Sequence, residues 1–219
     1  MLEISKVDVY GLERAIITSR YPKVVNVKEY WKNLDGKSYA QAEKCIKTLA
    51  NTGGAEGHEQ ALTGITVTFD LTASIQFWPE AQRYKFLNFI SSTSKMHKLS
   101  KMSISKCCNE HVDKDLIEIA KKYQDNYNKD YERYQNKAIS KEKLDESFYK
   151  MVYNIPLGFE LTAGMITNYR CLRNIYRQRR NHRLEEWQVF CDWIETLPMA
   201  DELITVGLKE GRNKYKKEN

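Results

Sequence analysis

Hydrophobic and polar residues follow several different spacings along this chain, and each spacing predicts an element. Residues 2–10 alternate between the two kinds, as a half-buried strand does. Residues 64–71 are rich in β-branched and aromatic side chains, which favour strands, and residues 158–166 form a third strand-like segment. We therefore expect three strands that lie far apart in the sequence.

Apolar residues at intervals of three and four predict helices between these strands. Ser38 with Gln41 resembles a capping box, and the helix after it is expected to stop at Gly53-Gly54. A short helix is predicted over 75–85, with Pro79 in its first turns. Longer helices are predicted over 113–134, from Ser140 to a point before Pro156, over 167–178 and over 183–197.

The helix predicted over 113–134 carries one stripe of apolar and tyrosine side chains. A face that packs against other elements would have this pattern, and a platform on which bases stack is the alternative. The members of the stripe are Leu116, Ile119, Ala120, Tyr123, Tyr127, Tyr131 and Tyr134.

Strands mixed with helices in 219 residues predict an α/β (α+β) fold in a single domain over 1–219. Hydrophobic residues at 42% exclude a disordered chain, and 10 glycines with 4 prolines exclude a collagen-like one. The N-terminus lacks a secretory pattern, and residues 60–79 are too polar to span a membrane. The five cysteines have no CxxC spacing, so we expect a cytoplasmic protein with reduced thiols and without a metal site, Cys107, Cys108 and His111 notwithstanding.

The net charge of +6 indicates anionic partners, and six arginines fall within residues 170–183. On a helix, Asn168, Leu172, Ile175 and Arg179 share one face, which contains two core-type residues. Arg179 should therefore point inward, with Arg173, Arg177 and Arg180 on another face. An inward arginine needs a partner.

Two kinds of partner fit an inward Arg179. One is a buried glutamate such as Glu185 or Glu186; the other is a phosphate-bearing small molecule, which a guanidinium binds through two hydrogen bonds. A helix that reads a nucleic-acid duplex would instead direct its arginines outward, so the pattern favours a nucleotide pocket.

A second group of polar residues surrounds the strand over 64–71. His58-Glu59 precedes this strand, Arg83-Tyr84-Lys85 follows it, and residues 86–95 add hydroxyl groups and Lys95. Hydroxyls beside cations suit a phosphate and a ribose. His58 alone is also compatible with a purely structural role.

Taken in order, these segments resemble the flavin-dependent thymidylate synthases. That family has a His-Glu, a strand, and an Arg-His-Arg triplet followed after seven residues by a serine. Here His58-Glu59, the strand, Arg83-Tyr84-Lys85 and Thr93 keep that order and spacing. The family's Leu-Pro-Leu and Asn-x-Arg-x-Leu motifs, with a later arginine, correspond to Ile155-Pro156-Leu157, Asn168-Tyr-Arg170-Cys-Leu172 and Arg179.

Several positions depart from the family pattern. Tyr84 stands for the histidine of the triplet, Lys85 for its second arginine, and Lys95 for the arginine after the serine. The remaining departures are Pro79-Glu80 for Arg-Gln, Ile90-Ser91 for Asn-Glu, and Val152 for an arginine before Leu-Pro-Leu. Arg83, the hydroxyl at Thr93, Asn168, Arg170, Asn174 and Arg179 are retained.

The resemblance implies a central mixed or antiparallel sheet flanked by helices, and methylation of dUMP to dTMP with FAD, methylenetetrahydrofolate and NADPH. It assigns Arg179 to the pyrimidine, where it would stabilise negative charge during catalysis. Nucleotide contacts are expected from Glu80, Arg83, Ser91, Thr93, Lys95 and Arg179. FAD contacts are expected from His58, Arg83, Tyr84, Lys85, Asn168, Arg170, Asn174 and Arg183.

The family also implies a homotetramer with FAD sites between subunits. The arginine pattern and the hydropathy lead us to expect neither nucleic acid nor a membrane as partner. Two alternatives stay open. The same fold could act on another pyrimidine or form a hydroxymethyl product, because the Glu80 carboxylate would accept a hydrogen bond from the amine of dCMP. The chain could also be an inactive homologue whose basic face binds an anionic partner.

Overall fold

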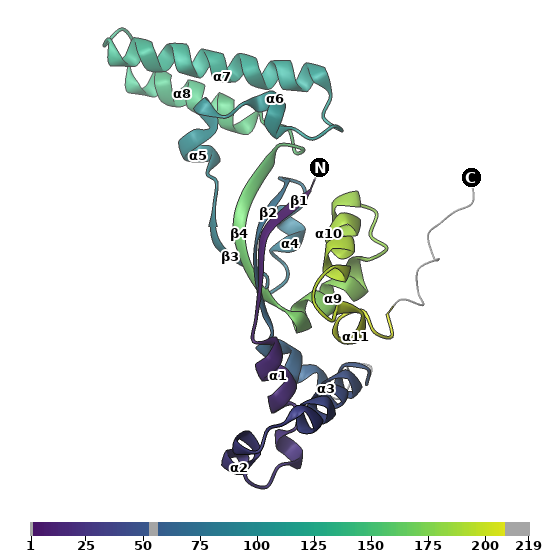
Figure 1. Cartoon of the computed structure of the whole chain (residues 1–219). Coiled ribbons are helices and arrows are strands. Elements are labelled where there is room, and N and C mark those ends of the chain that lie inside the picture. Colours follow the sequence, from purple (N-terminus) through teal and green to yellow (C-terminus); the bar gives the residue numbers. More distant parts are fainter. Residues whose placement is uncertain (1, 53–56, 209–219) are drawn as a thin grey trace, which may run out of the picture. The chain divides into compact units, whose positions relative to one another are not determined.

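Four strands form one sheet in the computed structural model, which describes residues 2–52 and 57–208 (Figure 1). The strands are β1 (Glu3–Tyr10), β2 (Thr66–Ser74), β3 (Asn88–Ser92) and β4 (Glu160–Asn168), in the order β1-β2-β4-β3. The three strands predicted from the sequence are confirmed, and β3 is an additional one. The α/β (α+β) class is confirmed as well.

Strands β2 and β4 run antiparallel. The Tyr169 amide donates to the Ile65 carbonyl at one end of the pair, and the Ile75 amide donates to the Phe159 carbonyl at the other, each at 3.0 Å. Residue numbers therefore rise along one strand as they fall along the other. The expected sheet is thus antiparallel at its centre.

The helices are more numerous than the sequence predicted. The α-helices are α1 (Leu12–Thr18), α2 (Val27–Lys32), α3 (Gly36–Ala50), α4 (Trp78–Ala81), α5 (Lys95–Lys98), α6 (Ile104–Cys107), α7 (Lys114–Gln135), α8 (Lys141–Tyr153), α9 (Tyr169–Arg179), α10 (Glu185–Glu195) and α11 (Ala200–Leu203). Short 3-10 helices are η1 (Tyr21–Lys23), η2 (His58–Gly64) and η3 (Leu99–Lys101).

Two helix predictions are corrected. Asp35, and not Ser38, is the cap of α3, because the Asp35 carboxylate accepts from the Ser38 amide and the Ser38 hydroxyl accepts from the Asp35 amide. The helix predicted over 75–85 is only α4, because the amides of Ile75 and Gln76 continue the sheet by donating to Phe159 and Leu157. The predicted stop at Gly53-Gly54 lies outside the described residues.

The chain divides into two compact units, and β2 and β4 belong partly to each. Of the described residues, 2–3, 71–83 and 89–164 form unit 1, while 4–52, 57–70, 84–88 and 165–208 form unit 2. The single domain predicted over 1–219 stays a prediction.

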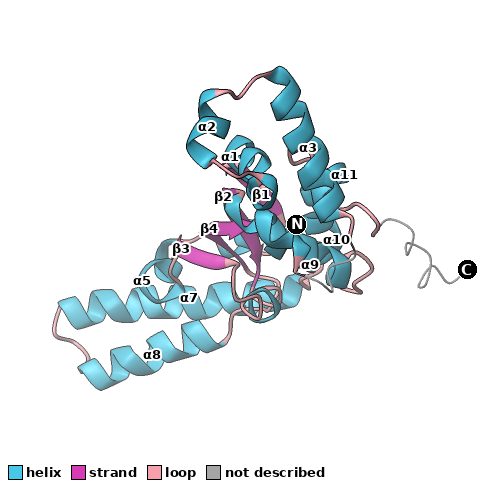
Figure 2. Cartoon of the chain, turned by 90° about the horizontal axis from the view of Figure 1, so that it is seen from below, coloured by secondary structure: helices cyan, strands magenta, loops and turns pink. Residues whose placement is uncertain are grey.

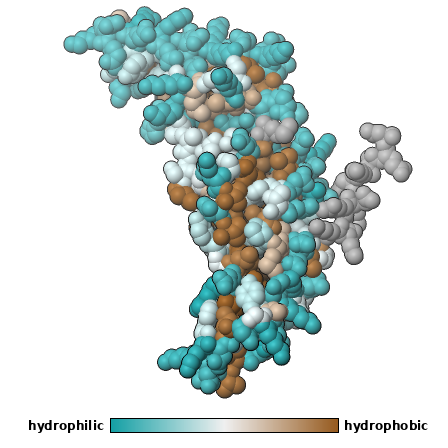
Figure 3. All heavy atoms as spheres, viewed as in Figure 1, coloured by the Kyte–Doolittle hydropathy of each residue, from teal (hydrophilic) through white to brown (hydrophobic). Residues whose placement is uncertain are grey.

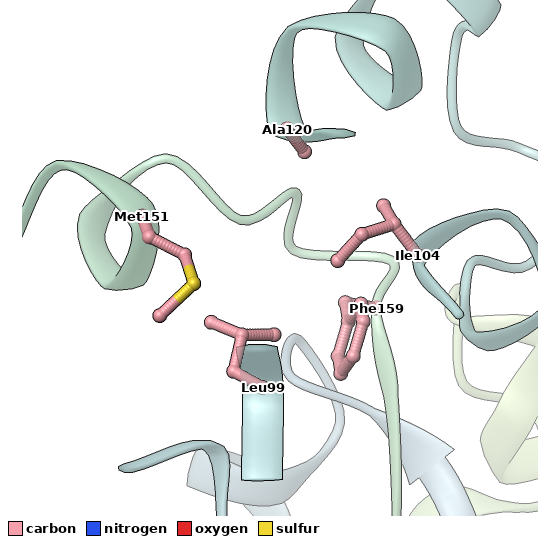
Figure 4. Packing of buried hydrophobic residues seen from close by; sticks show 5 residues of the cluster. All are labelled: Leu99, Ile104, Ala120, Met151 and Phe159. Carbon is pink, nitrogen blue, oxygen red and sulfur yellow. The ribbon is translucent and has the colours of Figure 1, made fainter. Parts of the chain in front are cut away.

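In unit 1, α7 and α8 lie side by side as a hairpin (Figures 1 and 2). Asp113 caps α7 and Ser140 caps α8, as the sequence predicted for Ser140. Beneath the hairpin, buried side chains from η3, α6, α7, α8 and the residue just before β4 converge on one cluster (Figure 4). Its buried members are Leu99, Ile104, Ala120, Met151 and Phe159.

The tyrosine stripe of α7 is a packing face over part of its length. Tyr123 and Tyr127 pack against the cluster, and the Tyr127 ring lies 5.6 Å from that of Phe148 on α8. Leu116 and Ile119 at the other end of α7 are exposed. Hydrophilic side chains dominate the outer surface of the hairpin (Figure 3).

The core of unit 2 lies where β2 meets α9 and α10. Side chains of β2 alternate between buried and half-buried, and the Phe69 ring lies 4.7 Å from Trp193 and 6.1 Å from Phe190. Where β1 turns into α1, Gly11 has φ +78°, and a Cβ there would collide with the carbonyl of Gly64. The turn into α1 therefore requires glycine.

Phe159→Ala tests the cluster of unit 1. Because Phe159 is fully buried, its truncation is expected to cost about 3 to 5 kcal/mol of unfolding free energy, measured by urea denaturation. Tyr153→Ala is the control, since the Tyr153 side chain is 81% exposed and its loss should change stability little. Equal effects of the two substitutions would contradict this packing.

Candidate active site

Helix α9 carries three of the predicted site residues of unit 2, Arg170, Asn174 and Arg179, and Asn168 fixes where it begins. Asn168 is the last residue of β4, and its side-chain oxygen accepts from the Cys171 amide at 2.9 Å. This bond caps α9 and satisfies one of the amides that the first turn leaves unpaired. Asn168 therefore fixes the residue at which α9 begins.

Arg173 is the most deeply buried arginine of the helix, although the sequence pattern places it on another face than the inward one of Arg179. Its Nε donates to Glu59 at 2.7 Å, with 6% of the Arg173 and 13% of the Glu59 side chain exposed. Its Nη1 donates to the carbonyls of Ile204 (2.8 Å) and Val206 (3.0 Å). The sequence pattern failed here because a guanidinium that bonds a carboxylate and two carbonyls can occupy a buried position.

A second arginine of α9 also bonds η2, at the residue that follows Glu59. Arg170 Nη1 donates to the side-chain oxygen of Gln60 at 2.7 Å. Arg170 and Arg173 are one turn apart on α9, and their partners Glu59 and Gln60 are adjacent in η2. The two pairs hold η2 against α9, which places the exposed His58 at the edge of this contact.

The solvent-facing side of α9 presents amide and guanidinium groups. The side-chain oxygen of Asn174 accepts from Arg177 (2.9 Å) and from Gln178 (3.2 Å). Arg177 and Gln178 are exposed, as are Lys85 and Arg183. These groups form a hydrophilic surface with excess positive charge.

Arg179, the predicted catalytic residue, lies at the C-terminal end of α9 in a cradle of two aromatic rings. Its Nε donates to the Tyr84 hydroxyl at 2.8 Å, and its guanidinium lies 4.8 Å from the centre of the Trp187 ring. The Tyr84 hydroxyl in turn donates to Gln178 at 3.0 Å. Arg179 is half-buried, so its predicted inward direction is confirmed.

The electrostatics of the cradle follow from burial. Tyr84 is 8% exposed, and burial raises the pKa of its phenol, while the neighbouring Arg179 acts in the opposite direction. The phenol is therefore neutral near pH 7 and both accepts and donates a hydrogen bond. Arg179 supplies the positive charge of the cradle.

The donor set of unit 2 fits a cofactor with a diphosphate group such as FAD. The half-buried Arg170 and the exposed Arg177 and Arg183 supply guanidinium groups, which suit phosphate oxygens. Asn174 and His58 add groups that bind neutral polar atoms.

Unit 1 contains a cavity of 250 Å³ beside β3 and β4. The rings of Trp78 and Phe89, whose centres are 5.0 Å apart, form one wall with the apolar side chains of β4. Gln82, Ser92 and Lys95 add polar groups to the lining. An apolar wall with an ammonium group at its edge suits a planar ring that carries an anionic group.

The predicted residues of unit 1 are only partly brought together. Lys95 lines the cavity, whereas Ser91, in exposed β3, does not. The Thr93 hydroxyl bonds the backbone of Thr162, at 3.1 Å from its amide, and extends the pairing of β3 with β4. Glu80 lies in α4 and Arg83 just beyond it, both outside the lining of this cavity.

The sequence patterns did not indicate the aromatic residues beside Arg179 and around the cavity of unit 1, nor the partner of Arg173. Trp78 and Phe89 lie next to or within the segment over 79–93, and Trp187 follows Arg179 by eight residues, but in the sequence they look like ordinary apolar core positions. Glu59 lies 114 residues from Arg173, so no local spacing connects the pair. One signal was accessible: residues 81–109 contain six lysines and arginines and no acidic residue, which marks this segment as strongly basic.

Comparisons with known proteins support the fold. No protein-family model and no curated protein matches the chain. A structure of Thymidylate Synthase X (ThyX) from Helicobacter pylori with FAD and dUMP is similar at a TM-score of 0.61 and 15% identity, covering 93% of this chain and 97% of that chain. A second ThyX structure from the same organism, complexed with FAD and dUMP, has a TM-score of 0.60 at 15% identity, covering 92% and 97%.

The UMP/dUMP methylase PolB from Streptomyces cacaoi, bound with 5-Br dUMP, is similar at a TM-score of 0.58 and 13% identity, covering 94% and 95% of the two chains. The fold implied by the sequence resemblance is thus confirmed over nearly the whole chain. Within residues 2–52 and 57–208, no helix has the length and apolar character that crossing a membrane requires.

Glu59→Gln tests the buried ion pair. Leaving Arg173 buried without its carboxylate is expected to cost about 3 to 5 kcal/mol of unfolding free energy in urea. The double variant Glu59→Gln/Arg173→Met should lose less than the sum of the two single variants, because neither charge is left buried alone.

Glu146→Gln is the matched control for this substitution. Glu146 forms ion pairs with Lys143 and Lys150 on the exposed side of α8, and its loss should leave the denaturation midpoint almost unchanged. A similar loss at both glutamates would mean that the Glu59 pair is not desolvated.

Proposed function

We propose that this chain is a flavin-dependent enzyme that transfers one carbon to C5 of a pyrimidine nucleotide, with dUMP as substrate and dTMP as product. In the overall reaction dUMP, methylenetetrahydrofolate, NADPH and a proton give dTMP, tetrahydrofolate and NADP⁺. Support comes from the fold, which resembles structures solved with FAD and dUMP, and from the motifs that the chain keeps.

The observation that carries the proposal is the arrangement of Arg179. A guanidinium fixed at one nitrogen by a neutral phenol and backed by an indole ring is already oriented before a ligand arrives. Such a preorganised cation stabilises negative charge without further rearrangement. In the proposed reaction, Arg179 binds the pyrimidine and stabilises the charge on its ring as C5 becomes nucleophilic.

FAD is the proposed cofactor, and when bound it supplies the redox chemistry that converts the transferred carbon to a methyl group. Arg170, Arg183 and Lys85 would neutralise its phosphates, while Asn174 would bind its polar atoms. Asn168, whose oxygen caps α9, retains its amide group as a donor. His58 and Arg83 complete the proposed FAD-binding residues. Tyr84, which the resemblance also assigns to FAD, is left out of this set because its ring is buried and its hydroxyl bonds Gln178 and Arg179.

The nucleotide is assigned to the basic segment of unit 1. Lys95 would bind the phosphate as a point charge, and Arg83 would bind it through two hydrogen bonds. Ser91, Thr93 and Glu80 are proposed nucleotide contacts. Lys95 lines the cavity beside Trp78 and Phe89, which supports the assignment of the anionic phosphate to this segment.

A homotetramer with active sites between subunits, in the cytoplasm, completes the proposal. Glu80 and Lys95, which depart from the family pattern, are among the proposed nucleotide contacts, so other pyrimidine nucleotides are candidate substrates as well. The similar PolB structure is described as that of a UMP/dUMP methylase, so UMP is a second candidate substrate, and dCMP with a methyl or hydroxymethyl product is a third.

The purified protein is expected to bind FAD, measured as quenching of flavin fluorescence during titration. A protein that neither carries nor binds FAD would contradict the proposal and would favour an inactive homologue. Nucleic-acid affinity with a steep dependence on salt would then indicate a polyanion as partner.

Tritium release from C5-labelled nucleotides is expected with dUMP when FAD, NADPH and methylenetetrahydrofolate are present. Parallel reactions with labelled UMP and dCMP identify the preferred pyrimidine. Release from dCMP alone would overturn the assignment of dUMP and leave the one-carbon chemistry standing.

Arg179→Ala is expected to lower kcat with dUMP about 100-fold or more, because it removes the preorganised charge. Arg133→Ala is the control: Arg133 lies on exposed α7, paired with Asp130, and kcat should stay unchanged. Full activity in Arg179→Ala would remove Arg179 from the proposed site.

A further inference from the structure

Tyr84 stands where the related enzymes have the histidine of their Arg-His-Arg triplet, and its contacts differ from a ligand-binding role. Its ring is buried, with its edge 5.7 Å from Trp187 in a nearly perpendicular arrangement. Its hydroxyl lies between two residues of α9, accepting from Arg179 and donating to Gln178. The polar atom of the Tyr84 side chain, its hydroxyl oxygen, is thus directed to α9.

These contacts restrict Arg179 in three ways. The hydrogen bond from Nε to the Tyr84 hydroxyl restricts rotation of the guanidinium within its own plane. The Trp187 ring at 4.8 Å and the Tyr84 ring at 5.6 Å fix its tilt through cation–π attraction. The bond to Gln178 fixes the phenol itself, since a hydroxyl that donates in one direction has a defined direction for accepting.

From this geometry we propose that Tyr84 is a positioning residue, which holds Arg179 in the orientation that binds the pyrimidine nucleotide. Tyr84 acts through Arg179 and does not itself touch the reacting atoms. The inference rests on the proposed function, because the nucleotide is the ligand that Arg179 is held to receive. It deepens that function by giving a role to the tyrosine that replaces the histidine of the family's triplet: the Tyr84 side chain orients Arg179.

Tyr84→Phe removes only the hydroxyl and keeps the ring beside Trp187. A hydrogen bond to a charged group contributes roughly ten- to a hundredfold in an equilibrium constant. We expect Tyr84→Phe to weaken dUMP binding to the FAD-loaded protein about tenfold and to lower kcat by a similar factor, with FAD affinity unchanged. Isothermal titration measures the affinity.

A double-mutant cycle separates positioning from general loss of structure. In the Arg179→Ala background, Tyr84→Phe should have no further effect on dUMP affinity, because the residue that it positions is absent. Tyr169→Phe is the matched control: Tyr169 is also buried on α9, its hydroxyl donates to the Pro198 carbonyl at 2.7 Å, and dUMP affinity should be unchanged. Unchanged affinity in Tyr84→Phe, or an equal loss with and without Arg179, would overturn the inference and leave the proposed function intact.

The hydrogen bond itself is measurable without any ligand. In ¹⁵N-labelled protein, the Nε–H resonance of Arg179 should exchange slowly with water in the wild type and rapidly in Tyr84→Phe. If the wild type binds neither FAD nor dUMP, the proposed function fails and the nucleotide role of Tyr84 fails with it. Rapid exchange in the wild type would overturn the positioning contact independently of that outcome.

Discussion

The buried pair of Arg173 and Glu59 is the interaction on which the arrangement of unit 2 depends. One guanidinium bonds a carboxylate of η2 and two carbonyls of the segment after α11, so a single side chain connects three parts of the chain. Burying both charges costs solvation energy, and the ion pair with the two hydrogen bonds to carbonyls offsets part of that cost. Helix α9 is consequently held in one rotation about its axis, and the directions of Arg170 and Arg179 follow from it.

Elements with strong local patterns could be predicted from the sequence, and elements set by distant contacts could not. The tyrosine periodicity of α7 and the cap at Ser140 define α7 and α8 without reference to the rest of the protein. Strand β3 could not be anticipated, because Asn88–Ser92 is exposed along its whole length and has no apolar alternation that favours a strand. Its pairing with β4 decides its conformation, including the bond that the Thr93 side chain makes to the backbone of Thr162.

Residues of the candidate site could be predicted from the sequence only where their position in a motif also determines their local structural role, such as a helix cap or a place on the inner face of a helix. Asn168 and Arg179 lie where their motif spacing places them, one as a cap and the other on the inner face of α9. The burial of Arg173 was not indicated, because helical periodicity treats every arginine as polar and takes no account of a glutamate more than a hundred residues away. The aromatic walls at Trp78 and Trp187 depend on tertiary packing and had no signal in the motifs.

A tyrosine at position 84 also determines how the cradle responds to acidity. A histidine there would gain a proton in the range between pH 5 and pH 8 and would place a second positive charge beside Arg179. Burial keeps the pKa of the Tyr84 phenol above its usual value, so the cradle has the same charge throughout that range. A pH dependence of the proposed nucleotide binding near neutral pH would therefore originate outside the phenol–guanidinium pair. The phosphate of a nucleotide has a second ionisation in that range.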